Sequence, residues 1–472
     1  MGLKRYKASQ DTTITNAFEA NLQTRGTGSN MGASDILEVF SIANQASSAS
    51  NERSRILIQW DLTDVVADRA AGNIPVSGST NWIIKLTNAE HGQTVPSGFN
   101  LLVQPVSQSW EEGFGLDMEE YSDLTRDAIG ANWVNAGSGA LWTTEGGDYL
   151  SNYIFSQSFD DGIEDLEVDI TDLVEAWIAG DIPNNGVGIF LSGSAESGSA
   201  QSFYTKRFFA RGSEFFFRQP ILEARFDSTR KDNRGNFVAS SSLLSSTENT
   251  NTIYLYNNFR GQPRNIPSIG TGTVYVNFYS DPVTGTLING TPITGGYVET
   301  GVYSASVALD TTASVVYDRW FSGSNVFHTG VIEINTQVAD NSVLQSQDFL
   351  STITNLKHVY SPEENVRFRL FTRRRNWSPT IYRKAREKVQ GQIVDDVYFK
   401  ILRVTDEVDE VEYGTGSLNH TRLSYDVSGS YFDFNMSMLE PGYAYGIKFM
   451  FNIDGKYEEQ PNTFKFRVES EL

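Results

Sequence analysis

An acidic segment, residues 111–127, carries the side chains best suited to chemistry in this sequence. Its seven carboxylates are Glu111, Glu112, Asp117, Glu119, Glu120, Asp123 and Asp127. Calcium prefers oxygen ligands, so Asp117, Glu119 and Asp123 are candidate ligands, although their spacing is not that of a fixed calcium loop. Glu111, Glu112 and Asp117 are candidates for glycoside hydrolysis, which requires a particular separation between two carboxyl groups. A solvated loop, or a contact for a basic partner protein, explains the same residues without either role.

Three tryptophans lie next to the acidic segment in the sequence. Trp110 precedes it, while Trp133 and Trp142 follow among glycines. Exposed indole rings beside carboxylates could stack on sugar rings and bind a glycan. The alternative is that the rings close the edge of a β-sandwich, which is the commoner use of large aromatic side chains.

A second charged region has the opposite sign. It comprises Arg373, Arg374, Arg375, Arg383, Lys384 and Arg386. The whole chain has a formal net charge of −21, which repels a polyphosphate backbone and argues against a nucleic-acid partner. We therefore expect this basic region to contact the acidic segment of a neighbouring copy, head to tail, as in a ring.

The sequence offers few groups for nucleophilic or metal-dependent catalysis. Its four histidines, His91, His328, His358 and His420, are isolated and have no metal-ligand spacing. The Gly-Ser-Ala-Glu-Ser-Gly string at 193–198 lacks the context of a nucleophile elbow, and the sequence contains no phosphate-binding loop. We expect no enzymatic activity and no cofactor, with calcium as the one ion considered.

Composition limits the class of protein further. At 472 residues the chain exceeds the usual size of one core, so several domains are expected. Without cysteine, neither disulfides nor thiolate zinc sites hold it together. No apolar run reaches the ~18–20 residues that span a bilayer, and residues 1–10 lack an apolar signal core. We expect synthesis in the cytoplasm and no membrane partner.

The first half of the chain is organised around residues 166–191, which predict a strand, a short helix, a turn and a second strand. Val168 and Ile170 alternate with acidic residues, as in a half-buried strand. Thr171 is expected to cap the helix, and Trp177 to plug one end of a β-sandwich. Gly180 should end the helix before the strand at 187–191.

Four motifs in this half appear in the order of a known family. They are Arg-Ser-Arg-Ile-Leu-Ile-Gln-Trp-Asp-Leu at 53–62, Val-Ser-Gln-Ser-Trp-Glu-Glu-Gly at 106–113, Ile-Thr-Asp-Leu-Val-Glu-Ala-Trp at 170–177 and the Pro-Ile-Leu strand at 220–226. Together they resemble the DNRLRE-type domain, a jelly-roll-like β-sandwich of bacterial surface proteins and phage virion proteins. The resemblance implies such a domain over residues 1–227.

The second half predicts two further β units. The polar stretch 227–235 has no apolar period and is the clearest linker. Short strands separated by glycine-rich turns then predict immunoglobulin-like sandwiches at 236–343 and 356–472. Residues 378–382, 413–416 and 460–468 are similar to C-terminal segments of structural proteins from marine tailed phages. The predicted fold is all-β: a jelly-roll-like sandwich with a short lid helix, followed by two immunoglobulin-like sandwiches.

The resemblance implies a non-enzymatic structural protein of a tailed phage particle, located in its head, neck or tail. Its partners would be copies of itself and other virion proteins. The alternative is a glycan-binding adhesin, with host surface glycan as the ligand and the three tryptophans as its site.

Overall fold

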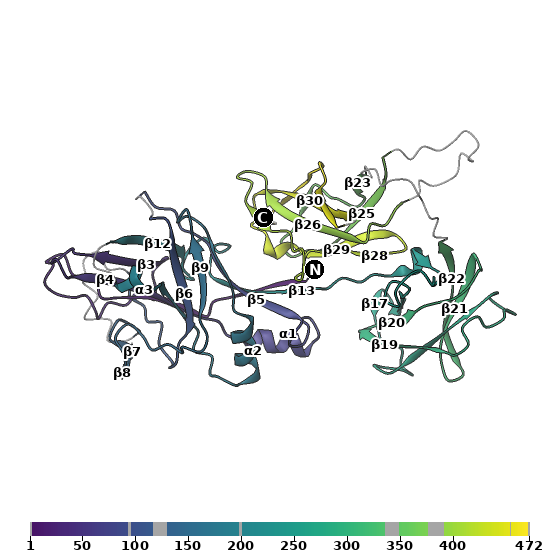
Figure 1. Cartoon of the computed structure of the whole chain (residues 1–472), viewed down its shortest axis with the longest axis horizontal. Coiled ribbons are helices and arrows are strands. Elements are labelled where there is room, and N and C mark those ends of the chain that lie inside the picture. Colours follow the sequence, from purple (N-terminus) through teal and green to yellow (C-terminus); the bar gives the residue numbers. More distant parts are fainter. Residues whose placement is uncertain are drawn as a thin grey trace. The chain divides into compact units, whose positions relative to one another are not determined.

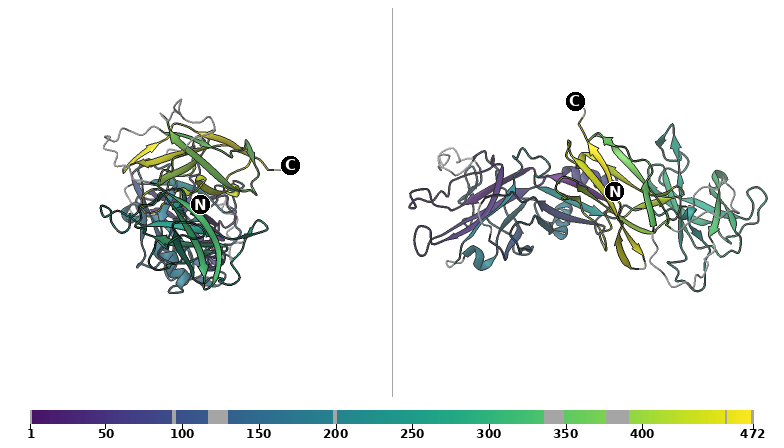
Figure 2. Two further views of the ribbon diagram at one scale, coloured as in Figure 1. Left: turned by 90° about the vertical axis from the view of Figure 1, so that its right-hand side faces the viewer. Right: turned by 90° about the horizontal axis from the view of Figure 1, so that it is seen from above.

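The computed structural model describes residues 2–92, 96–116, 130–197, 201–335, 349–375, 391–453 and 455–470. It forms two compact units, Gly2–Phe226 and Asp227–Leu472, and the second contains the strands of both predicted C-terminal domains. Strands dominate both units (Figure 1), and two further views show the same (Figure 2). The all-β prediction is confirmed. Among the described residues, no helix is both long and apolar enough to cross a membrane.

The first unit is a sandwich of two antiparallel sheets. One has the order β1 (Leu3–Lys7), β13 (Ile221–Phe226), β5 (Thr80–Leu86) and β10 (Leu166–Asp169). The other has the order β12 (Phe203–Phe209), β3 (Ile36–Ala43), β4 (Asn51–Gln59), β11 (Val187–Leu191), β6 (Phe99–Pro105) and β9 (Phe155–Phe159), and β2 (Gln10–Thr15) also pairs with β4. A small hairpin consists of β7 (Asn135–Gly137) and β8 (Ala140–Leu141); the helices are α1 (Thr63–Ala70), α2 (Thr171–Ala179) and α3 (Gly193–Ser197).

Helix α2 packs its apolar face on the core between the sheets. Leu173, Val174 and Trp177 are all buried there, as the sequence predicts. Gly180 ends the helix in a left-handed conformation, with φ of 80°. The predicted cap is wrong: Thr171 is the first helical residue, and its hydroxyl instead donates to Asp169 and accepts the Trp82 amide.

Strand β4 is buried on both faces, which creates a second core in the first unit. Ile56 and Ile58 point into the main core, whereas Leu57 points the other way, into the cluster that contains the three tryptophans. The chain just before β11 lies close to β4 at Gly186, where a Cβ would stand 2.1 Å from the Ile58 carbonyl oxygen. A larger residue there would push the two strands apart.

Within the second unit, the 3₁₀ helix η2 (Asn233–Gly235) precedes one continuous sheet that wraps round like a barrel. Its order is β14 (Phe237–Val238), β22 (Asn325–Asn335), β21 (Val315–Ser322), β18 (Val274–Tyr279), β19 (Ile293–Glu299), β20 (Val302–Val307) and β15 (Asn251–Tyr256). The buried Asn251 amide joins the two end strands: it accepts from the Val238 N–H at 3.0 Å and donates to the Val238 carbonyl at 2.8 Å. Strands β16 (Asn258–Phe259) and β17 (Gln262–Pro263) form a separate hairpin.

The C-terminal strands form a second sandwich within this unit. One sheet has the order β23 (Phe349–Ile353), β25 (Asn365–Arg374), β29 (Gly429–Asn435) and β28 (Ser424–Asp426). The other has the order β24 (Val359–Tyr360), β32 (Phe464–Val468), β30 (Ala444–Ile453), β26 (Asp396–Arg403) and β27 (Asp409–Val411), and β31 (Lys456–Glu459) pairs with β30. The 3₁₀ helix η3 (Met436–Met438) follows β29. Stacked aromatic rings fill the space between the sheets, among them Phe399 and Phe432 with centroids 4.0 Å apart.

Candidate functional site

The acidic segment is described only as far as Leu116. The predicted calcium ligands Asp117, Glu119 and Asp123 lie outside the described residues, so their prediction stands as made. Within the parts of the chain that the structure describes, no group of three or more histidine, aspartate or glutamate side chains could hold a metal ion.

At the start of the segment, the half-buried Glu112 belongs to a charged cluster with the buried Asp11 and the exposed Arg211. Its carboxylate accepts the Asp11 N–H at 2.9 Å and pairs with Arg211 at 2.6 Å. Asp11 is almost fully buried, and its carboxylate accepts the Arg211 N–H at 2.6 Å. Burial, together with the nearby Glu112 charge, raises the pKa of Asp11 to about 7. This cluster fastens β2 and the chain after β12 to the start of the acidic segment.

Asn30 ties the two ends of the same segment together. Its amide donates to the carbonyls of Glu112 and Ala131, both at 2.8 Å, and accepts the N–H groups of Gly32 and Gly115. Sequence reasoning missed this residue, because an asparagine in a glycine-rich stretch has the pattern of an ordinary turn.

Glu111 has different partners from Glu112. Its carboxylate accepts the Ser138 N–H at 2.8 Å and packs against Gly137 in the β7–β8 hairpin. The two carboxylates considered for glycoside hydrolysis therefore anchor two different loops, and the third, Asp117, is not described.

Trp110, Trp133 and Trp142 are buried, with exposed fractions of 6%, 3% and 5%. The Trp110 indole N–H donates to the Asn185 carbonyl and that of Trp142 to the Asn132 carbonyl, both at 2.8 Å. Rings buried to this extent cannot stack on a sugar. The glycan-contact prediction for these residues is therefore corrected: they form the second core of the first unit.

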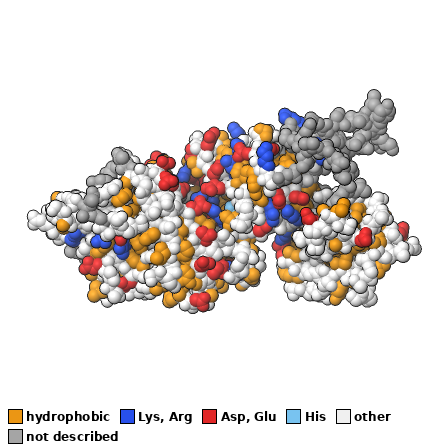
Figure 3. Space-filling model, in the orientation of Figure 1, with side chains coloured by type: hydrophobic (Ala, Val, Ile, Leu, Met, Phe, Trp, Pro, Cys, Tyr) orange, Lys and Arg blue, Asp and Glu red, His pale blue; other side chains and the backbone are white. Residues whose placement is uncertain are grey.

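The basic region is described only in part. Arg373 and Arg374 end strand β25, and Arg375 follows it. Arg374 donates to the Gln392 side chain at 3.0 Å. Arg383, Lys384 and Arg386 lie outside the described residues. On the face shown in Figure 3, uncharged and hydrophobic groups cover most of the surface, and acidic and basic side chains adjoin only in places.

The predicted linker, 227–235, is an ordered part of the second unit. Residues 230–232 form an isolated parallel β-bridge with the edge of β28: the Tyr425 N–H donates to the Arg230 carbonyl and the Asp232 N–H to the Tyr425 carbonyl, both at 3.0 Å. Arg422 also pairs with Asp227. The polar composition predicts a linker here, but it does not predict these backbone bonds.

The same stretch covers the edge of β15 with side chains. The Asn233 amide oxygen accepts the Thr252 N–H at 2.9 Å. The Asp232 carboxylate is 2% exposed, accepts the N–H groups of Arg234 and Tyr254, and has its pKa raised to about 6 by burial. These acceptors take the place of a further strand beside β15.

Arg234 fixes the linker to the barrel-like sheet. Its guanidinium makes two hydrogen bonds to Asp318, at 2.8 and 2.6 Å, and the Trp320 indole N–H donates to the same carboxylate at 2.7 Å. Burial on its own would raise the pKa of Asp318, but the bonds and charge of Arg234 outweigh it and lower that pKa. Sequence reasoning had assigned neither residue a role.

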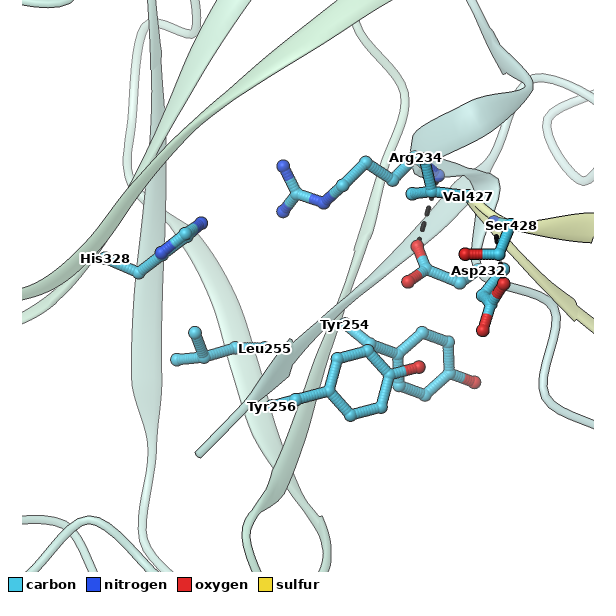
Figure 4. Close-up of a pocket in the computed structure, with 9 residues that line it drawn as sticks. Asp232, Arg234, Tyr254, Leu255, Tyr256, His328, Val427 and Ser428 are labelled. Carbon is cyan, nitrogen blue, oxygen red and sulfur yellow. Dashed lines mark hydrogen bonds between the residues drawn. The ribbon is translucent and has the colours of Figure 1, made fainter. Parts of the chain in front are cut away.

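A cavity of about 280 Å³ lies at the joint where residues 232–234 meet β15, β22 and the turn after β28. Its lining residues are Asp232, Arg234, Tyr254, Leu255, Tyr256, His328, Asp426, Val427 and Ser428. Figure 4 shows the rings of Tyr254 and Tyr256 lying side by side below the Asp232 carboxylate, with Arg234 extended above and His328 on the opposite side. The cavity thus combines an aromatic surface with hydrogen-bond donors and acceptors.

Comparison with known proteins gives no family. No family model matches the chain, and no curated protein matches it. Among solved structures, the FN1–FN3 domains of chicken CNTN1 are similar at 12% identity, covering 57% of this chain and 82% of that one, with a TM-score of 0.15. Salmonella alpha-2-macroglobulin reacted with methylamine is similar at 9% identity over 99% of this chain, with a TM-score of 0.16, and the chain spans 34% of its length. Scores this low carry no argument about function.

Proposed function

We propose that this chain is a non-enzymatic structural component of a tailed phage particle. It would lie in the head, neck or tail of the virion and contact copies of itself and other virion proteins through its sandwiches.

The observation that carries this proposal is the use of buried charge. Several buried charged side chains are paired with one another so that they fasten strands together. Glu223 lies between Arg5 and Arg225, and Arg234 holds Asp318. Removing one partner of such a pair would leave the other charge buried and uncompensated, which is strongly destabilising. A protein whose buried charges fasten its strands together suits the role of a scaffold.

The particle itself is proposed from the sequence resemblance. The motifs at 53–62, 106–113 and 170–177 occupy most of β4 with the residues after it, the chain after β6, and most of α2, all in one sandwich. That arrangement is compatible with the resembled jelly-roll-like domain. Contacts between copies would use the opposite charges of the acidic segment and the basic region, and association should therefore weaken as salt screens them.

The experiment is quantitative mass spectrometry of purified particles, combined with chemical cross-linking. We expect a repeated copy number per particle and cross-links between copies of the chain. If the chain is absent from particles that are otherwise complete, the proposal is overturned. Light scattering of the purified chain at low and high salt tests the charge-mediated contacts separately.

The glycan-binding alternative is not carried forward on Trp110, Trp133 and Trp142, because their burial leaves no ring face for a sugar.

A further inference from the structure

The outward face of β15 carries two parallel aromatic rings. Side chains alternate along this strand, so Thr252, Tyr254 and Tyr256 point away from the barrel core. The tyrosine rings are stacked, with centroids 6.1 Å apart and planes inclined by 21°. Tyr256 is 44% exposed and lines the cavity. Opposite Tyr254 on β20 is the small residue Ser304, which leaves space beside the rings.

The facing wall is polar and belongs to the turn between β28 and β29. Asp426, Val427 and Ser428 line the cavity there, and Asp426 is held in place by the Ser428 N–H at 2.8 Å. Arg234 and His328 close the remaining sides (Figure 4). Hydroxyl, imidazole, guanidinium and carboxylate groups therefore surround an aromatic floor.

The charges around the cavity are already compensated. Asp426 makes two bonds to Arg369, both at 3.0 Å, and Arg234 makes two to Asp318. The third charged group, Asp232, lies beneath the surface, where backbone N–H groups hold it. A ligand that meets this surface gains hydrogen bonds and an apolar ring face rather than a strong ion pair. This combination favours a neutral ligand with hydroxyl groups on its rim and C–H groups on its faces.

We propose that this cavity binds a neutral pyranose sugar, whose C–H face lies on Tyr256 and whose hydroxyls bond to Asp426, Ser428 and Arg234. The volume accommodates one ring of a glycan that continues into solvent. The site is separate from the buried tryptophans of the first unit. It goes beyond the proposed scaffold function, because a particle protein with such a site would also contact a surface glycan.

The test is saturation-transfer difference NMR on the full chain. The probes are the methyl pyranosides of glucose, galactose, mannose and N-acetylglucosamine, with lysine methyl ester as a cationic probe. We expect transfer to the ring C–H protons of at least one sugar. Tyr256→Ala should weaken its binding at least tenfold, and Ser428→Trp, which fills the cavity from an exposed turn, should do the same.

The matched control is Tyr457→Ala. Tyr457 is 45% exposed and lies 6.0 Å from the ring of Tyr398, so it is an equally exposed, paired tyrosine away from the cavity. Its loss should leave sugar binding unchanged. Three results would each overturn the proposal: no transfer to any sugar, equal binding by the Tyr256 and Tyr457 variants, or transfer to lysine methyl ester alone, which would make this a cation site. The scaffold proposal depends on particle composition and would survive such a failure.

Discussion

Replacing Glu223 with glutamine tests whether buried charge holds the first sandwich together. The carboxylate lies in β13, is 1% exposed, and accepts from Arg5 at 2.8 Å and from Arg225 at 2.6 Å. Burial opposes its ionisation, but the arginines prevail and lower its pKa from 4.5 to about 2. A difference of about 2.5 pH units corresponds to ~3 kcal/mol of stability at neutral pH.

The sign of the pH dependence follows from the lowered pKa. The unfolded chain binds the proton more readily, so this stability is present above pH 4.5 and is lost as the pH falls through about 2. We expect Glu223→Gln to lower the free energy of unfolding by ~3 kcal/mol at pH 7, and the difference from the wild type to shrink towards zero near pH 2.

Urea unfolding followed by tryptophan fluorescence measures this change, because six of the eight tryptophans lie in Gly2–Phe226. The control is Glu167→Gln, which also removes a partner of Arg225 but is 30% exposed, and should cost less than ~1 kcal/mol. A Glu223→Gln effect below ~1 kcal/mol, or one that is equal at pH 7 and pH 2.5, would refute the reasoning.

Three more predictions concern the cluster at the acidic segment and the joint. Because the pKa of Asp11 is raised from 3.8 to about 7, its contribution to stability is present below pH 3.8 and is lost as the pH rises through about 7. Calorimetry should therefore show the Asp11→Asn variant melting at a higher temperature than the wild type at pH 8 but not at pH 4. A lower melting temperature of the variant at both pH values would contradict this. Arg234→Met leaves Asp318 buried without its cation and should lower the free energy of unfolding of the second unit by ~3–5 kcal/mol, measured by urea unfolding. The control, Arg319→Met, removes an arginine with an exposed hydrogen bond and should cost less than ~1 kcal/mol. Equal losses would count against a stabilising role of the Arg234–Asp318 pair. Asn30→Ala removes the acceptor of the Gly32 and Gly115 backbone N–H groups. The hydrogens of these two groups should then exchange with deuterium at least tenfold faster. Unchanged exchange rates would show that other contacts protect them.

Local patterns predicted the fold well where one side of an element is buried. The segment 166–191 gives the strand, helix, glycine stop and second strand that the structure contains, because each has a clear period or a residue with special backbone freedom. Helix α1 (Thr63–Ala70) was missed. Only Val65 of its residues is buried, so the sequence has almost no apolar period there.

The candidate site was harder to predict, because no local sequence pattern indicates that a strand is buried on its second face as well as its first. Leu57 alternates with Ile56 and Ile58 as a solvent-facing residue would, yet it packs on the tryptophan cluster. The linker shows the same limit. Asp232 and Asn233 look like solvent-exposed polar residues, but they accept backbone N–H groups along a strand edge that only the folded chain brings to them.

The most direct test of a scaffold role is the copy number of this chain in purified particles, measured by mass spectrometry against labelled peptides from residues 53–62 and 464–468. We predict a constant, repeated number of copies in every preparation, with cross-links between copies. Finding the chain only outside particles would contradict the proposed role.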